Sequence, residues 1–74
     1  MIEGYEVKVT DSHGREIAPG DRITDFRGRP WQFKEVSRGP LPGKIAMVIA
    51  YDPEADDEVE RYASVFGLTV TPVG

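Results

Sequence analysis

Arginine and aromatic side chains alternate in one stretch of the chain, residues 22–38, and these residue types are well suited to binding another molecule. A guanidinium pairs with a carboxylate or a phosphate through two parallel hydrogen bonds, and an exposed aromatic ring stacks on a nucleic-acid base. Residues 22–44 hold six basic residues against two acidic ones, so this part of the chain is cationic. The predicted contact surface consists of Arg22, Phe26, Arg27, Arg29 and Arg38.

Residues 52–61 carry the opposite charge, with six acidic residues against one arginine. Their first, third and fifth positions are carboxylates, as in a calcium-binding loop, but Asp57 stands where that loop requires glycine and Ala63 where it requires glutamate. We therefore expect a solvated acidic loop that protects a strand edge from aggregation, and no metal site. The alternatives are a weak calcium site or an acidic mimic of DNA built on residues 52–60.

The candidate catalytic residues do not combine into a reaction centre. His13 is the only histidine, and it lies in a turn where its neighbours Ser12 and Gly14 point in other directions, so a Ser-His-Asp relay is excluded. No cysteine nucleophile is present. Residues 39–44 end in Gly-Lys like a phosphate-binding loop, but Ile45 follows the lysine and a strand is expected where such a loop needs a helix. We expect a non-enzymatic protein with no cofactor.

Composition restricts the fold and the compartment. Seventy-four residues make one domain with a thin core, because so short a chain buries only about 60% of its unfolded surface. The absence of cysteine excludes disulfides and thiolate metal sites and suits a reducing cytoplasm. The first residues do not form a signal peptide, and the longest apolar run, residues 45–51, is far shorter than the roughly 20 residues that span a bilayer. We expect a cytoplasmic protein.

Short alternating runs between glycine and proline turns predict an all-β chain. Strands are expected at residues 5–10, 15–17, 22–26, 31–36, 44–51, 58–63 and 68–71. Out-of-phase apolar residues predict a bulge or a sharp bend near Asp25 and a bend at Val36. A one-turn 3-10 helix at residues 64–67 is expected before the last strand, with residues 72–74 as a tail. Residues 52–63 also fit an amphipathic helix, which is the alternative for that segment.

The large apolar side chains are needed for the core of so small a protein. Trp31 and Phe33 share one face of their strand, and we expect them to be buried rather than to form a ligand platform. The residues expected to be structural are Trp31, Phe33, Ile45, Met47, Ile49, Val65 and Phe66.

The order of the expected elements carries a resemblance. A Gly-Asp entry at residues 20–21 is followed by a bent strand, a wide turn, three strands, a one-turn helix and a closing strand, which resembles the SH3-like antiparallel barrel. Residues 20–70 also resemble small SH3-like barrel proteins of unknown function from actinobacteria and their phages. The motifs that carry the resemblance are Thr24-Asp25-Phe26-Arg27-Gly28, Trp31 with Phe33, Ser37-Arg38-Gly39-Pro40, and Ser64-Val65-Phe66-Gly67-Leu68.

The resemblance implies a single SH3-like barrel domain over residues 1–74, with the barrel at residues 20–71 and an extra N-terminal hairpin within residues 1–19. It transfers no activity. We expect a protein-interaction or assembly module, encoded by a phage or a mobile element and acting in the host cytoplasm. Separate patches of opposite charge orient docking, and self-association could join the acidic loop of one copy to the arginine turn of the next. The alternative is a small nucleic-acid-binding barrel that uses the same arginines, although a net charge of −4 opposes it.

Overall fold

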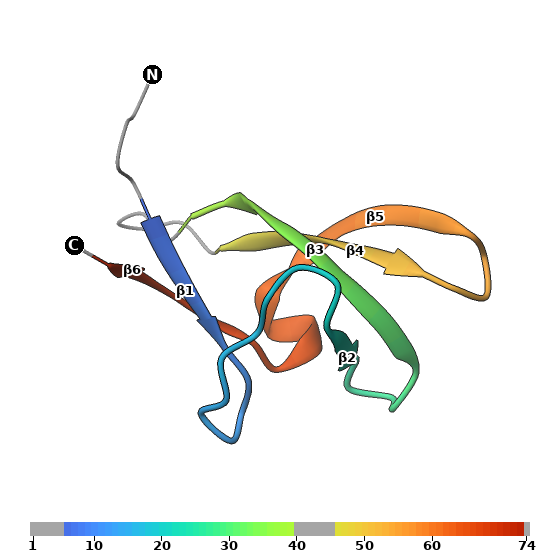
Figure 1. Ribbon diagram of the computed structural model, residues 1–74. Helices are drawn as coiled ribbons and strands as arrows, with labels where there is room; N and C mark the ends of the chain where they lie inside the picture. Colours follow the sequence, from blue (N-terminus) through green and yellow to red (C-terminus); the bar gives the residue numbers. More distant parts are fainter. Residues whose placement is uncertain (1–5, 40–45, 74) are drawn as a thin grey trace.

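The computed structural model describes residues 6–39 and 46–73, which form six strands and one short 3-10 helix (Figure 1). The all-β prediction is confirmed. The alternative helix at residues 52–63 is wrong, because most of that segment is a strand paired antiparallel with its predecessor. The elements are β1 (Glu6–Thr10), β2 (Arg22–Thr24), β3 (Pro30–Arg38), β4 (Met47–Asp52), β5 (Asp57–Tyr62), η1 (Ala63–Phe66) and β6 (Thr69–Val73).

The strands are divided between two antiparallel sheets. One sheet has four strands in the order β2-β3-β4-β5, and the other consists of β1 and β6, which lie side by side in Figure 1. Backbone pairing among the described residues does not join these sheets into a closed barrel. The structure therefore establishes two antiparallel sheets, a coarser statement than the predicted barrel.

The main pairing partner of the first strand is the last strand, β6, and not the segment at residues 15–17 that was expected to complete an N-terminal hairpin. β1 is in register with β6 over its whole length, whereas the return strand expected at residues 15–17 is reduced to a single bridge between Thr10 and Glu16. Pro72 and Val73, expected to belong to a tail, are part of β6, where they lie opposite Val7 and Glu6. A proline fits there because a strand in a two-stranded sheet needs no outward N–H for a further neighbour.

The chain bends at both places where the sequence predicted an irregularity, near Asp25 and near Val36. The register between β3 and β4 shifts between Phe33 and Glu35, and again between Val36 and Arg38, so the expected bend of this strand is confirmed. Of the bulge or sharp bend expected near Asp25, the structure has the bend: β2 ends at Thr24 and the chain turns at Asp25, whose carbonyl accepts the N–H of Gly28.

Three of the seven residues that the sequence predicted to be structural are buried in the core. Trp31, Phe33 and Phe66 are buried, and the rings of Trp31 and Phe66 meet edge to face at a centroid distance of 5.4 Å. In β4 the buried apolar positions are Val48 and Ala50, whereas Met47 and Ile49, predicted to be structural, alternate with them and are half-buried on the other face. Val65 is half-buried as well, and Ile45 lies outside the described residues.

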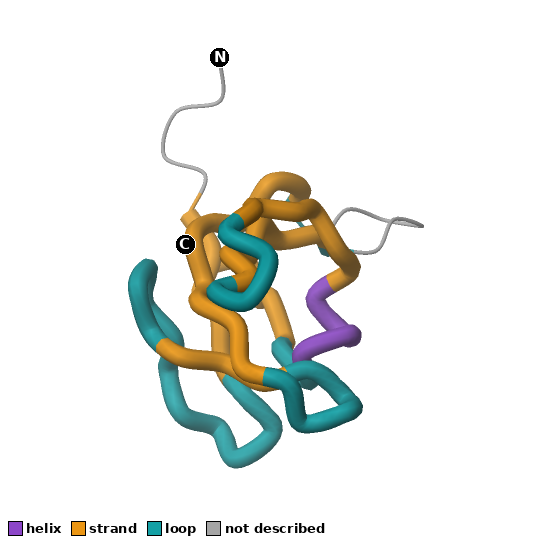
Figure 2. The backbone as a smooth tube through the Cα atoms, turned by 90° about the vertical axis from the view of Figure 1, so that its right-hand side faces the viewer, coloured by secondary structure: helices purple, strands orange, loops and turns teal. Residues whose placement is uncertain are grey.

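The one-turn helix is confirmed and ends as expected. Figure 2 shows η1 at one side of the strands. Gly67 adopts a left-handed conformation with φ of 68°, its N–H donates to the Ser64 carbonyl, and the N–H of Leu68 donates to the Ala63 carbonyl. This cap turns the chain from η1 into β6 and buries Phe66 beneath the sheets.

Truncating a buried phenylalanine should unfold this protein, while truncating an exposed one should not. Phe33 is 2% exposed and Phe26 is 75% exposed. Phe33→Ala is expected to cost about 3–5 kcal/mol, which is as much as a core of this size supplies in total. Urea denaturation followed by circular dichroism should show an unfolded Phe33→Ala chain and an unchanged midpoint for Phe26→Ala. A cooperative unfolding transition in Phe33→Ala near the wild-type midpoint would contradict this description of the core.

Candidate functional site

Residues 25–29, called the basic turn below, connect β2 to β3 and are held in shape by their own polar groups. The Asp25 carboxylate accepts hydrogen bonds at one oxygen from the backbone N–H groups of Arg27 (2.8 Å) and Arg29 (3.0 Å). The backbone closes the same loop, since the N–H of Gly28 donates to the Asp25 carbonyl at 2.9 Å and the N–H of Asp25 donates to the Arg29 carbonyl at 3.1 Å. Gly28 supplies the positive φ of 82° that this geometry requires.

The same aspartate ties the basic turn to the core. The second carboxylate oxygen of Asp25 accepts a hydrogen bond from the Trp31 indole N–H at 3.1 Å. Trp31 is 8% exposed, so its only polar group would otherwise be left without a partner close to the core. Burial of the tryptophan and closure of the turn therefore depend on one carboxylate.

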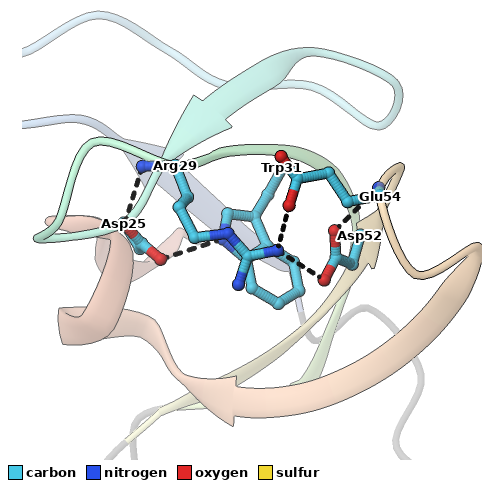
Figure 3. A network of polar contacts seen from close by, with 5 residues as sticks. All are labelled: Asp25, Arg29, Trp31, Asp52 and Glu54. Carbon is cyan, nitrogen blue, oxygen red and sulfur yellow. Dashed lines mark hydrogen bonds and ion pairs between the residues drawn. The ribbon is translucent and has the colours of Figure 1, made fainter.

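Arg29 links the basic turn to the hairpin between β4 and β5 (Figure 3). One terminal nitrogen of its guanidinium donates to Asp52 at 2.9 Å and to Glu54 at 3.1 Å, and the guanidinium carbon lies 5.5 Å from the centre of the Trp31 ring. Asp52 is 7% exposed, and its other oxygen accepts the backbone N–H of Glu54 at 2.9 Å. The charge of Arg29 is thus paired with two carboxylates of the same chain.

The hydrogen bonds of this network keep its aspartates ionised. Desolvation of Asp25 favours the neutral form, but hydrogen bonds from the Arg29 backbone and the Trp31 indole outweigh it and lower the pKa of Asp25. The pKa of Asp52 is likewise lowered against the effect of desolvation, by the Glu54 backbone N–H and the Arg29 guanidinium. In return, the hydrogen bond and the charge of Asp52 raise the pKa of Arg29.

The basic turn holds a large apolar ring out in the solvent. Phe26 is 75% exposed, and the guanidinium of Arg27 lies over its ring with the carbon 5.4 Å from the ring centre. The turn therefore presents one aromatic ring with a cation beside it, on a backbone that four hydrogen bonds hold within residues 25–29.

A surface groove begins at the basic turn and runs along the inner face of β5. Val59 and Val65 in this groove are half-buried, and Arg61 is exposed beside them. Arg61 was not among the predicted contact residues, because it is the one base in an acidic run of the sequence. Its register pairing opposite Val48 places it on the same face as Val59, opposite Ala50. The groove is lined by Asp25, Phe26, Arg27, Arg29, Trp31, Asp52, Val59, Arg61 and Val65.

The five predicted contact residues do not lie together. Phe26, Arg27 and Arg29 share the basic turn. Arg22 is exposed on β2, on the face opposite to buried Ile23, where it lines a different hollow with Tyr51 and Pro53. Arg38 ends β3 at the far end from the turn, up to about 26 Å away at the rise of an extended strand.

Residues 6–39 and 46–73 contain neither a membrane-spanning helix nor a group of metal-binding side chains. In these ranges no helix is long and apolar enough to cross a membrane, and no three His, Cys, Asp or Glu side chains come together in a metal-binding group. His13 is exposed, and its backbone N–H donates to the Asp11 side chain within the turn after β1. Comparison with known proteins finds no matching family model, curated protein or solved structure.

Replacing the central carboxylate should lower stability in a pH-dependent manner. Because the pKa of Asp25 in the folded protein lies below its ordinary value of 3.8, the stability it contributes is present above that value and is lost as the pH falls through the folded pKa. Asp25→Asn replaces an accepting oxygen with an NH₂ donor that faces N–H donors. The unfolding free energy of the variant should therefore be lower than that of wild type at pH 7. The difference from wild type should narrow below about pH 4.

Urea denaturation at several pH values from 7 to below 4 measures this difference. The matched control is Asp57→Asn, which changes an exposed carboxylate at the start of β5 and should follow the wild-type curve. A constant gap between the Asp25→Asn and wild-type curves over the whole pH range would contradict the role given to the ionised carboxylate.

Proposed function

We propose that this chain is a non-enzymatic protein-interaction or assembly module that docks a protein partner on the basic turn. The observation that carries the proposal is Phe26, an aromatic ring that is 75% exposed on a turn braced by hydrogen bonds. Aromatic residues and arginine are enriched among the anchors of protein interfaces. A ring that is already fixed in position binds without a further cost of ordering its loop.

The distribution of charge supports docking in a defined orientation. Arg27 stands beside Phe26 with its guanidinium over the ring. The β4–β5 hairpin presents exposed carboxylates at Glu54, Asp56 and Glu58. Separate basic and acidic surfaces steer a partner into one orientation and increase the association rate more than the affinity.

We also propose that the two sheets are the halves of an SH3-like barrel. The proposal is supported by the antiparallel succession β3-β4-β5, by η1 after it, and by the return of β6 to pair with β1. In such a barrel residues 11–21 would be part of a long first connection rather than an appended hairpin. Origin in a phage or mobile element, and action in the host cytoplasm, are proposed from the sequence resemblance alone.

A nucleic-acid-binding barrel is the second candidate, and the Phe26–Arg27 pair is the observation in its favour. A base could stack on the exposed ring while the neighbouring cation meets a phosphate. However, Arg29 is paired with Asp52 and Glu54, and Arg38 lies at the other end of β3. A net charge of −4 also opposes phosphate binding, so the protein partner ranks first.

Selection from a displayed random peptide library tests the proposed function. Peptides selected on the wild-type protein should include a set whose affinity falls at least about tenfold for Phe26→Ala, the effect of losing an interface anchor worth 1.4 kcal/mol. Tyr62→Ala is the matched control, since Tyr62 is the other exposed large apolar residue among the described ones, at 49%. The same peptides should bind Tyr62→Ala with the affinity that they have for wild type.

Titration with single-stranded DNA and RNA at low and high salt separates the second candidate. If the partner is a protein, the titrations should show no oligonucleotide binding that depends on Phe26. Oligonucleotide binding that is lost in Phe26→Ala and weakens steeply with salt, together with no Phe26-dependent peptide, would replace the first proposal with the second.

A further inference from the structure

The groove beside the basic turn has an apolar floor that the rest of the fold leaves partly open. β5 is an edge strand of the four-stranded sheet, and Val59 is its one half-buried residue, the other five being exposed. Val59 pairs with buried Ala50 and packs against the core together with Val65 of η1. The inner face of the sheet therefore continues to this edge, where these two valines and Trp31 line a surface groove.

The charges at this groove differ in whether they already have partners. Asp25 accepts three N–H groups, and Asp52 is paired with Arg29, so the two carboxylates of the groove are satisfied within the protein. Arg27 and Arg61 have no carboxylate partner within the described part of the chain. The Arg61 guanidinium donates only to the backbone carbonyl of Glu60, at 3.0 Å.

The charged groups of the groove that are left to bind a ligand are thus two arginines, on a chain whose net charge is −4. Guanidinium groups at the edge of a low-polarity floor favour carboxylates, because charge-assisted hydrogen bonds are stronger than neutral ones. A basic ligand would find its complement elsewhere, on the exposed carboxylates of the β4–β5 hairpin. Charge complementarity therefore selects an acidic occupant for the groove.

We propose that this groove binds an acidic peptide segment of a partner protein. One bulky apolar side chain of the segment lies over Val59 and Val65 against the Phe26 ring, and its flanking carboxylates pair with Arg27 and Arg61. This inference rests on the proposed function, which requires only that a protein docks on the basic turn. It adds the chemistry of the partner and a second strand, β5, to the docking surface.

The test uses three short synthetic peptides and the full chain labelled with ¹⁵N. One peptide has a central leucine flanked by glutamates, the second replaces the glutamates with lysines, and the third replaces the leucine with serine. The acidic leucine peptide should shift the amide resonances of Phe26, Arg27, Val59, Arg61 and Val65. It should bind at least about tenfold more tightly than either of the other two.

Charge reversal locates the binding site. Arg61→Glu should weaken binding of the acidic leucine peptide by at least about tenfold, and Arg61→Gln should weaken it less. Arg38→Glu is the matched control, since it reverses an exposed arginine at the far end of β3 and should leave the affinity unchanged. Each variant is first compared with wild type by its amide spectrum, so that a loss of binding is not a loss of fold.

The failure of this inference and the failure of the proposed function give different results. Equal or tighter binding of the lysine peptide, or insensitivity of the acidic peptide to Arg61→Glu, overturns the inference. If library peptides that depend on Phe26 are nevertheless found, the proposed function stands and only the partner chemistry is wrong. If no peptide depends on Phe26, both are overturned.

Discussion

The carboxylate of Asp25 is the interaction on which the arrangement of the site depends. One oxygen holds the backbone of the basic turn, and the other satisfies the indole of Trp31 beside the core. The basic turn also places Arg29 over the Trp31 ring, where the guanidinium donates a hydrogen bond to Asp52, which is 7% exposed. Turn, core and the β4–β5 hairpin are thus connected through a single side chain.

This network contributes geometry more than stability. The Arg29 side chain is 42% exposed, so water screens its ion pairs and reduces the energy that they add. Their directions are nevertheless fixed, because the guanidinium contacts Asp52, Glu54 and the Trp31 ring together. The consequence is a turn that presents Phe26 to the solvent at the edge of the groove.

Local patterns predicted the local structure, and the long-range pairings were beyond them. The alternation around Val7 and Val9 predicted a strand, and the glycine at 67 predicted the end of η1. The pairing of β1 with β6 was missed because side-chain alternation marks a strand without naming its partner. The assignment of Trp31 and Phe33 to the core was right because both lie on the inner face of β3, whereas Phe26 lies in the turn between β2 and β3.

The site itself was predicted only in part, because a charge in the sequence does not show its partner. Phe26 and Arg27 were identified, while the capture of Arg29 by Asp52 and the inclusion of Arg61 required the register of β4 with β5. Relaxation of the ¹⁵N nuclei in residues 25–29 and in the Trp31 indole tests the central claim that this turn is rigid. The account predicts order parameters near 0.85, as in a strand, for the amides of Phe26 to Arg29. Values below about 0.6 would show a mobile loop and contradict it.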